Sequence, residues 1–177
     1  CDKQILFMNE TIEDFRSFFK PKKESSQFNV ASAIHEVLHL TRHSLDLHHI
    51  EVILSLTESL VLYGIANEFK QALINLLMNA KDAIIDSHAE NKKIFITLQE
   101  LSSSIVLTLE DTGGGISEES IPHLFTPHYT TKEEKGTGIG LYMTQLIIEK
   151  SFHAHIDVRN SHYGACFILT FPKKDLK

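Results

Sequence analysis

The chain has 177 residues, of which 42% are apolar and 23% are charged. These proportions are typical of a soluble globular protein, and a chain of this length buries enough surface to fold without disulfides or a structural metal. They exclude a disordered or collagen-like chain, and no apolar run approaches the roughly 18 to 20 residues that a membrane-spanning helix needs. The formal net charge of −6 opposes binding to a nucleic-acid backbone, so we expect no nucleic-acid partner.

The chain contains two cysteines, Cys1 and Cys166, and neither belongs to a disulfide framework or a metal-binding pattern. This usage favours a reducing compartment, and we expect a cytoplasmic location for the domain. The chain begins without Met and opens directly into an amphipathic pattern. We therefore expect it to be part of a longer protein.

Residues 1–21 predict one end of an amphipathic helix. Apolar residues recur there at alternating spacings of three and four, as in a coiled-coil seam, and Pro21 ends the pattern. Two heptads do not distinguish a dimer contact from an arm that packs on its own domain. Residues 22–29 follow as a polar linker.

Residues 30–172 predict one α+β domain, and residues 173–177 a polar tail. The expected architecture is a two-layer sandwich: one mixed, mostly antiparallel sheet with helices on one face. Helical periodicity covers residues 30–45, 65–86 and 138–150, and strand patterns cover 51–57, 60–63, 94–98, 105–110, 155–160 and 165–171.

Three histidines, His35, His39 and His43, follow one flank of the first predicted helix. Adjacent imidazoles can bind a metal ion, but this flank lies opposite the apolar stripe and has no third ligand type nearby. We interpret these histidines as a solvated surface.

Six of the eight glycines fall into two clusters, residues 113–115 and 136–140. Glycine lets backbone N–H groups approach a ligand without interference from a Cβ atom, and the second cluster opens a predicted helix whose N-terminus favours anions. Neither cluster fits a GxxxxGK[ST] phosphate loop, and the second follows no strand, as a dinucleotide-binding fold would need. Taken alone, each cluster is better explained by ordinary turns and a helix cap.

Polar residues form a stripe beside the buried face of the helix predicted over residues 65–86. The stripe contains Asn75 and Asn79, one turn apart, although asparagine is a poor residue in a helix interior. A carboxamide oxygen can complete the octahedral coordination of Mg²⁺ beside a triphosphate; the alternative is a solvated face. Asp111, at a strand end, can accept a hydrogen bond from the exocyclic amine of adenine, but alone it is only a strand-end carboxylate.

Four segments, in this order, resemble the N, G1, F and G2 boxes of bacterial sensor histidine kinases. They are Asn75–Ala80, Asp111–Ile116, Leu124–Lys132 and Gly136–Leu141. The resemblance covers about residues 28–172 and implies the Bergerat-type α/β sandwich, shared with gyrase, the Hsp90 chaperones and MutL.

This resemblance also implies roles for individual residues. Asn79 would be the Mg²⁺ ligand, Asn75 its polar neighbour at the phosphates, and Asp111 the group that reads adenine. The segment from Ile116 to Lys135 would form a lid over ATP, with Phe125 as its packing hinge. The complete set of implied nucleotide-binding residues is Asn75, Asn79, Asp82, Asp111, Gly113, Gly115, Ile116, Phe125, Thr131, Lys132, Lys135, Gly136, Thr137, Gly138, Gly140 and Leu141.

One position departs from the family pattern. Many members carry a basic residue three positions after the second asparagine, where this chain has Asp82, with Lys81 one position earlier. The identity of the lysine that neutralises the phosphates therefore stays open.

The function implied by the resemblance is that of a transferase: the ATP-binding catalytic domain of a two-component sensor histidine kinase, a bacterial signal-transduction phosphoprotein. It would transfer the γ-phosphoryl group of ATP to a histidine in a dimerisation domain absent from this chain, and residues 1–21 would end that domain's second helix. The expected cofactors are ATP and Mg²⁺, and the expected partners are the dimerisation domain, a response regulator and a second copy of the full-length protein.

No catalytic residue is assigned within this chain, and we do not expect the chain alone to phosphorylate itself. His35 precedes an acidic residue, as the family's acceptor does, but it lies on a helix of the ATP domain and is rejected. The alternative function is an ATPase of the same fold that drives a conformational clamp. Such ATPases carry a glutamate as the base that activates water where this chain has Asn75, and an amide cannot take a proton at neutral pH.

Overall fold

The computed structural model describes residues 24–130 and 138–173. The arm predicted over residues 1–21 lies outside this part of the chain. No helix within the described ranges is long and apolar enough to cross a membrane.

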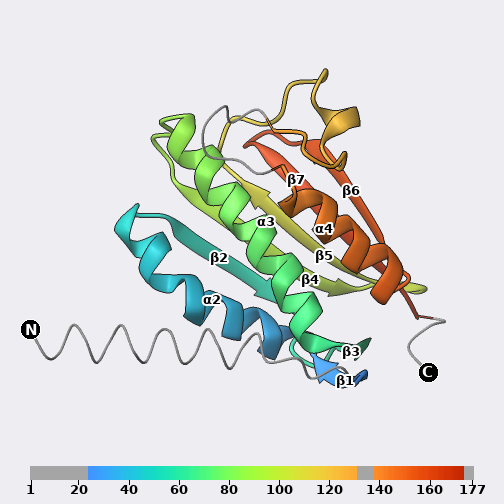
Figure 1. Ribbon diagram of the computed structural model, residues 1–177. Coiled ribbons are helices and arrows are strands. Elements are labelled where there is room, and N and C mark those ends of the chain that lie inside the picture. Colours follow the sequence, from blue (N-terminus) through green and yellow to red (C-terminus); the bar gives the residue numbers. More distant parts are fainter. Residues whose placement is uncertain (1–23, 131–137, 174–177) are drawn as a thin grey trace, which may run out of the picture.

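A five-stranded mixed sheet forms one layer of the domain, and helices cover one of its faces (Figure 1). The strand order is β2-β4-β5-β7-β6; β2 and β4 pair in parallel, and the other neighbours pair antiparallel. The strands are β2 (Glu51–Leu56), β4 (Lys93–Glu100), β5 (Ser104–Asp111), β6 (His155–Asn160) and β7 (Ala165–Pro172).

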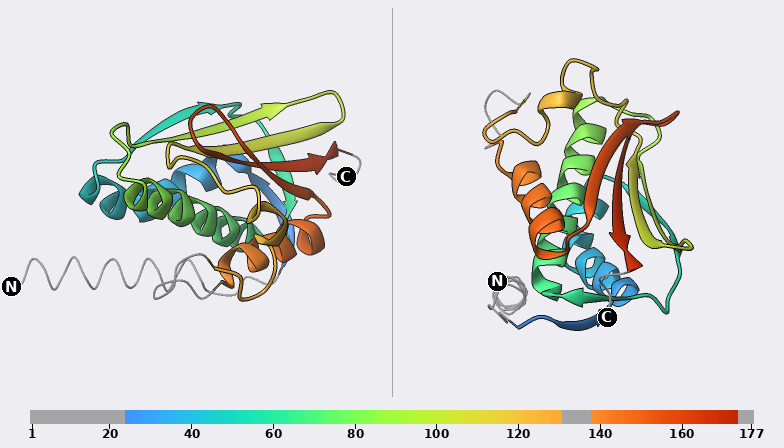
Figure 2. Two further views of the ribbon diagram at one scale, coloured as in Figure 1. Left: turned by 90° about the horizontal axis from the view of Figure 1, so that it is seen from above. Right: turned by 90° about the vertical axis from the view of Figure 1, so that its right-hand side faces the viewer.

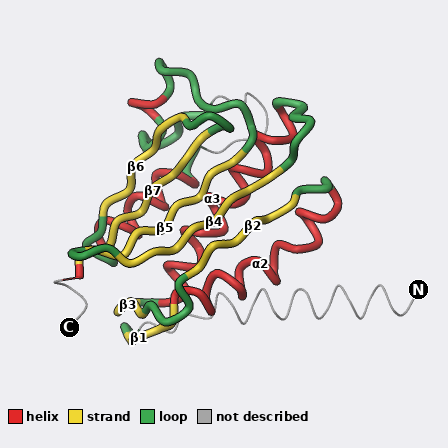
Figure 3. Tube along the Cα trace, turned by 180° about the vertical axis from the view of Figure 1, so that it is seen from behind, coloured by secondary structure: helices red, strands yellow, loops and turns green. Residues whose placement is uncertain are grey.

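Three α-helices of the described chain make the second layer. They are α2 (Val30–Leu47), α3 (Ala66–Asp86) and α4 (Gly140–Leu146). Figure 2 shows the two layers from the side, and Figure 3 shows the sheet face that no helix covers. This arrangement confirms the predicted α+β sandwich with helices on one face.

A second, two-stranded sheet lies at one end of the domain, which corrects the prediction of a single sheet. It pairs β1 (Ser26–Asn29) with β3 (Val61–Gly64), so the linker predicted over residues 22–29 ends in a strand. The sequence of β1 is polar and partly exposed, and it therefore lacks the apolar alternation that predicts strands. Asn29 then begins α2, because its Oδ1 accepts a hydrogen bond from the Ser32 N–H at 2.7 Å.

The helix predicted over residues 138–150 begins two residues later, at Gly140, and continues after Leu146 as a π-helical turn, Ile147–Ser151. Gly138 cannot join the helix, because its φ of +63° lies in the left-handed region. A Cβ atom at this position would lie 2.4 Å from the carbonyl carbon of His128, so the close approach of these two backbones also requires glycine.

An aromatic cluster joins the small sheet to the main core. Phe69 on α3 is 1% exposed, and its ring lies 5.5 Å from that of Phe28 on β1 and 6.2 Å from that of Phe171 on β7. Phe152, after the π-helical turn, completes the cluster, with its ring 6.0 Å from that of Phe171. These four rings hold the N-terminal end of α3, and Asn75, Asn79 and Ala83 follow further along the helix.

Replacing Phe69 by Ala should lower the free energy of unfolding by about 3–5 kcal/mol, because the cluster would keep a cavity that it cannot fill. Urea denaturation measures this change. Leu47→Ala is the control: Leu47 is 66% exposed, and its loss should change stability by no more than about 0.5 kcal/mol. Equal effects of the two substitutions would contradict the assigned role of the cluster.

Candidate functional site

Asn75 connects one face of α3 to the start of α4. Its Nδ2 donates to the Gly140 carbonyl oxygen at 3.3 Å and lies 3.4 Å from the hydroxyl oxygen of Thr144. Thr144 is fully buried, and its hydroxyl in turn donates to the same Gly140 carbonyl at 2.9 Å. The amide of Asn75 therefore faces two acceptors.

The same face of α3 meets the first glycine cluster two turns further along. A Cβ atom at Gly113 would lie 2.7 Å from the Cβ of Ala83, so close packing on the helix requires glycine at this position. Asn75, Asn79 and Ala83 are each four residues apart. Asn79 therefore lies midway between the two glycine clusters, about 6 Å along the helix axis from each contact.

Asp111 ends β5 beside this face, and it is only 2% exposed. Its Oδ1 accepts hydrogen bonds from the Gly113 N–H at 2.7 Å and the Ala165 N–H at 3.4 Å. Burial raises the pKa of the Asp111 carboxyl above its ordinary value of 3.8, the two backbone N–H groups oppose this shift, and the charge of Glu110 adds to it. The site thus holds a carboxylate that water solvates poorly.

The turn between β6 and β7 forms part of the surroundings of Asp111, and the sequence analysis did not single it out. A Cβ atom at Gly164 would lie 2.4 Å from the carbonyl oxygen of Asp111, so only glycine fits there. Ser161 closes the turn, because its hydroxyl accepts from the N–H groups of Tyr163 and Gly164 at 3.0 and 3.2 Å. The glycine between two predicted strands marked a turn, but no local signal tied it to Asp111.

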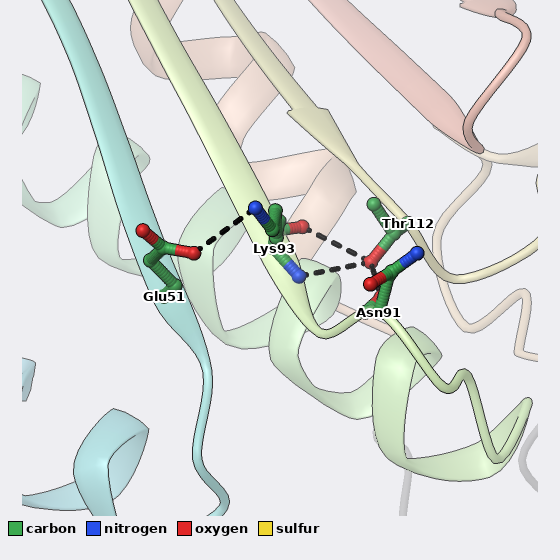
Figure 4. Close-up of polar contacts among 4 residues, drawn as sticks. All are labelled: Glu51, Asn91, Lys93 and Thr112. Carbon is green, nitrogen blue, oxygen red and sulfur yellow. Dashed lines mark hydrogen bonds and ion pairs between the residues drawn. The ribbon is translucent and has the colours of Figure 1, made fainter.

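Thr112 fixes the backbone that follows Asp111 (Figure 4). Its hydroxyl accepts from the Lys93 N–H at 2.9 Å and donates to the carbonyl oxygen of Asn91, and its own N–H donates to the Lys93 carbonyl at 3.2 Å. Lys93 also forms an ion pair with Glu51 on the edge strand, at 3.1 Å. These bonds attach the first glycine-rich segment to the start of β4.

The predicted lid begins with a folded segment. Ile116 and Phe125 pack partly buried against the core, and the role of Phe125 as the hinge of a lid stays a prediction. Within the segment, the hydroxyls of Ser117 and Tyr129 donate to the buried Ser120 hydroxyl at 2.7 and 2.9 Å. Five residues assigned to the nucleotide lie outside the described ranges: Thr131, Lys132, Lys135, Gly136 and Thr137.

The structure disfavours Lys81 as the lysine that neutralises the phosphates. Lys81 points toward α2, where its ammonium group donates to the Ser44 hydroxyl at 3.4 Å, and it also pairs with Asp82 at 3.5 Å. Since α4 lies on the other side of α3 (Figure 1), Lys81 does not face Gly140 at the start of α4. The contact between Asp82 and the nucleotide stays a prediction.

Gly140 and Leu141 lie at the start of α4, and the three histidines predicted to form a solvated surface lie on α2. A Cβ atom at Gly140 would meet only the Asn75 side chain, at an ordinary 3.9 Å, and Leu141 packs partly buried against the core. His35, His39 and His43 are exposed on α2. The residues that the structure describes contain no cluster of three or more metal-ligating side chains.

Comparison with known proteins gives this fold and site a family. Residues 64–175 match the family of histidine kinase-, DNA gyrase B- and HSP90-like ATPases, and the chain belongs to it. Nucleotide binding is therefore a property of the domain.

The most similar proteins include histidine kinases. The catalytic domain of histidine kinase ThkA superposes with a TM-score of 0.74 at 32% identity, over 85% of this chain and 98% of that domain. Sporulation kinase D of Bacillus subtilis is 30% identical over 97% of this chain and 33% of its own length, and sensor protein CitS of Halalkalibacterium halodurans is 35% identical over 58% and 19%. The chain thus spans about a fifth to a third of these two relatives and has the fold of a histidine kinase catalytic domain.

Replacing Asp111 by Asn should change stability in a pH-dependent way. Because the native-state pKa is raised, ionising Asp111 costs native-state free energy; the cost is absent below the ordinary pKa of 3.8 and complete above the raised value. The stability of Asp111→Asn relative to the unaltered protein should therefore rise as the pH increases through this window. Urea unfolding at a series of pH values measures it.

The control for this experiment is Asp86→Asn, which removes an exposed carboxylate at the end of α3. The difference between the two variants isolates the effect of burial. If the relative stability of Asp111→Asn stayed constant from acid to neutral pH, the raised pKa would be wrong.

Proposed function

We propose that this chain is the ATP-binding catalytic domain of a bacterial two-component sensor histidine kinase, which transfers the γ-phosphoryl group of ATP to a histidine of a dimerisation domain outside this chain. The observation that carries the proposal is the order of contacts along α3: Gly140 at Asn75, then Asn79, then Gly113 at Ala83. The two outer contacts are about 12 Å apart along the helix axis. A nucleotide fits this order with its phosphates near Gly140 and its base near Asp111.

Asp111 is suited to select adenine. Both recorded hydrogen bonds from the protein go to Oδ1, so the orientation of the carboxylate is fixed and Oδ2 is the oxygen that would accept from the exocyclic amine. Guanine carries a carbonyl oxygen in place of that amine, and it would meet the carboxylate with repulsion. Selection of ATP over GTP follows from this difference.

Asn79 fits the role of a Mg²⁺ ligand. It supplies a neutral, hard oxygen on the α3 face between the two glycine clusters, and the described residues place no acidic cluster there that would bind the cation without a nucleotide. Magnesium would neutralise charge on the phosphates as the phosphoryl group leaves. Asn79 would hold the ion, and Asn75 would keep the start of α4 in place beside it.

The surroundings of Asn75 favour phosphoryl transfer over ATP hydrolysis. A hydrolytic site needs a carboxylate base at this position, but the Gly140 carbonyl and the Thr144 hydroxyl both present acceptors to it. A glutamate there would place its charge against the Gly140 carbonyl oxygen, and the Thr144 hydroxyl could donate to it only by giving up its own bond to that carbonyl. The ATPase alternative is therefore disfavoured by the same contacts that position α4.

The partners of the full-length protein follow from this function. They would be the dimerisation domain, a second copy of the protein and a response regulator. A structural relative, histidine kinase ThkA, has been solved in complex with response regulator TrrA, at 26% identity and a TM-score of 0.72 over 97% of this chain. We extend that partnership, and a cytoplasmic location of the domain, to this protein as part of the proposal.

Replacing Asn79 by Ala should weaken binding of Mg²⁺-ATP by about tenfold or more, because one ligand of the cation is lost. Calorimetry with a non-hydrolysable ATP analogue measures the affinity with and without Mg²⁺, and the loss should be confined to the Mg²⁺ titration. Asn91→Ala, which removes an exposed amide, is the control. Unchanged Mg²⁺-dependent affinity in a folded Asn79→Ala variant would remove Asn79 from the metal site.

The chain alone should bind ATP and hydrolyse it much more slowly than about 1 per second, because it offers no base for water at position 75. Incubation with γ-labelled ATP should leave no acid-labile phosphate on the 177 residues. Adding a dimerisation domain that contains the acceptor histidine should produce labelled phosphohistidine on that domain. Rapid hydrolysis by the chain alone would instead support the ATPase alternative, and labelling of His35 would overturn its rejection as acceptor.

A further inference from the structure

Asn160, the last residue of β6, holds a backbone unit 44 residues away. Its Oδ1 accepts from the Ile116 N–H at 2.8 Å, and its Nδ2 donates to the Ile116 carbonyl at 2.7 Å. A carboxamide is the side chain that can bond the N–H and the carbonyl of one residue at once, because it carries an acceptor and a donor side by side. Ile116 ends the first glycine-rich segment and begins the predicted lid.

The contact is close enough to restrict the neighbouring residue. Gly115 has a φ of +87°, and a Cβ atom there would lie 2.8 Å from Asn160 Oδ1. The segment can therefore reach the amide of Asn160 only with glycine at position 115. The two residues fit each other as a pair.

The turn that follows Asn160 holds the other end of the same segment. Gly164 lies against the Asp111 backbone, and the Ala165 N–H donates to the Asp111 carboxylate. The turn is closed internally, since the Ser161 N–H donates to the Gly164 carbonyl at 2.8 Å. One compact turn thus contacts both ends of the segment from Asp111 to Ile116.

We infer that Asn160 is a positioning residue of the adenine site. Without its two hydrogen bonds, the segment would remain attached at Asp111 but would lose its fixed second end, and the surface that faces the base would lose its shape. This inference rests on the proposed function. Because the side chain of Asn160 is exposed, water can replace its bonds at little cost to stability, so its main effect is expected on binding.

The test compares Asn160→Ala and Asn160→Asp with His162→Ala in the full 177-residue chain. His162 is exposed on the same turn, with its ring 5.3 Å from that of Tyr163, so its replacement controls for changes to the turn. Affinity for adenosine is followed by NMR chemical shifts and affinity for an ATP analogue by calorimetry, both well below each variant's unfolding temperature. Asn160→Ala should lose about tenfold in both affinities, while His162→Ala binds as the unaltered chain does.

Asn160→Asp separates the two hydrogen bonds. Aspartate can still accept from the Ile116 N–H, but it places a second acceptor against the Ile116 carbonyl. The Asn160→Asp protein should therefore bind adenosine no better than the Asn160→Ala protein. Unchanged adenosine affinity in folded Asn160→Ala would overturn the inference and leave the proposed function intact. A drop in unfolding temperature with unchanged affinity would show a merely structural role and overturn it as well. If the unaltered chain bound neither adenosine nor ATP, the proposed function would fail, and the inference with it.

Discussion

The four-residue repeat along one face of α3 sets the spacing of the whole site. Asn75 contacts the start of α4, Ala83 contacts Gly113, and Asn79 lies between them. The helix cannot shift to change these distances, because the face beside this stripe is buried in the core through residues such as Leu76 and Leu77, both 0% exposed. The hydrophobic layer between helix and sheet therefore determines how far apart the two glycine clusters stand.

The buried carboxylate of Asp111 explains why glycine is needed on both sides of it. Two backbone N–H groups stabilise the charge, and they can reach it only where no Cβ atom intervenes, at Gly113 and Gly164. The raised pKa indicates that these two donors do not replace the lost water completely. Under the proposed function, the amine of adenine would supply a further donor to this carboxylate and so offset the free-energy cost of its burial.

The sequence predicts the parts of this molecule that depend on local periodicity. The polar stripe of α3, with Asn75 and Asn79 one turn apart, and the alternating strands of the main sheet needed only neighbouring residues to be recognised. The contacts that complete the site are long-range: Asn160 reaches Ile116 over 44 positions, and Ala165 reaches Asp111 over 54. No pattern within the turn itself marks such pairs, so the sequence alone could not predict them. The strand β1 could not be predicted for a different reason. Its residues show no apolar alternation, and only its pairing with β3 identifies it as a strand.

The position of His35 explains why it is not expected to accept a phosphoryl group within this domain. His35 lies on α2, is 53% exposed and has its Nε2 3.8 Å from Glu58, on the side of α3 opposite α4. A phosphoryl group held near Gly140 would have to cross α3 to reach it, which in-line transfer does not allow. Asn75 donates to the Gly140 carbonyl and so supplies no base there, and the buried Thr144 hydroxyl is bonded to the same carbonyl. Under the proposed function, this domain holds and orients the nucleotide, and the reacting nucleophile comes from a separate domain.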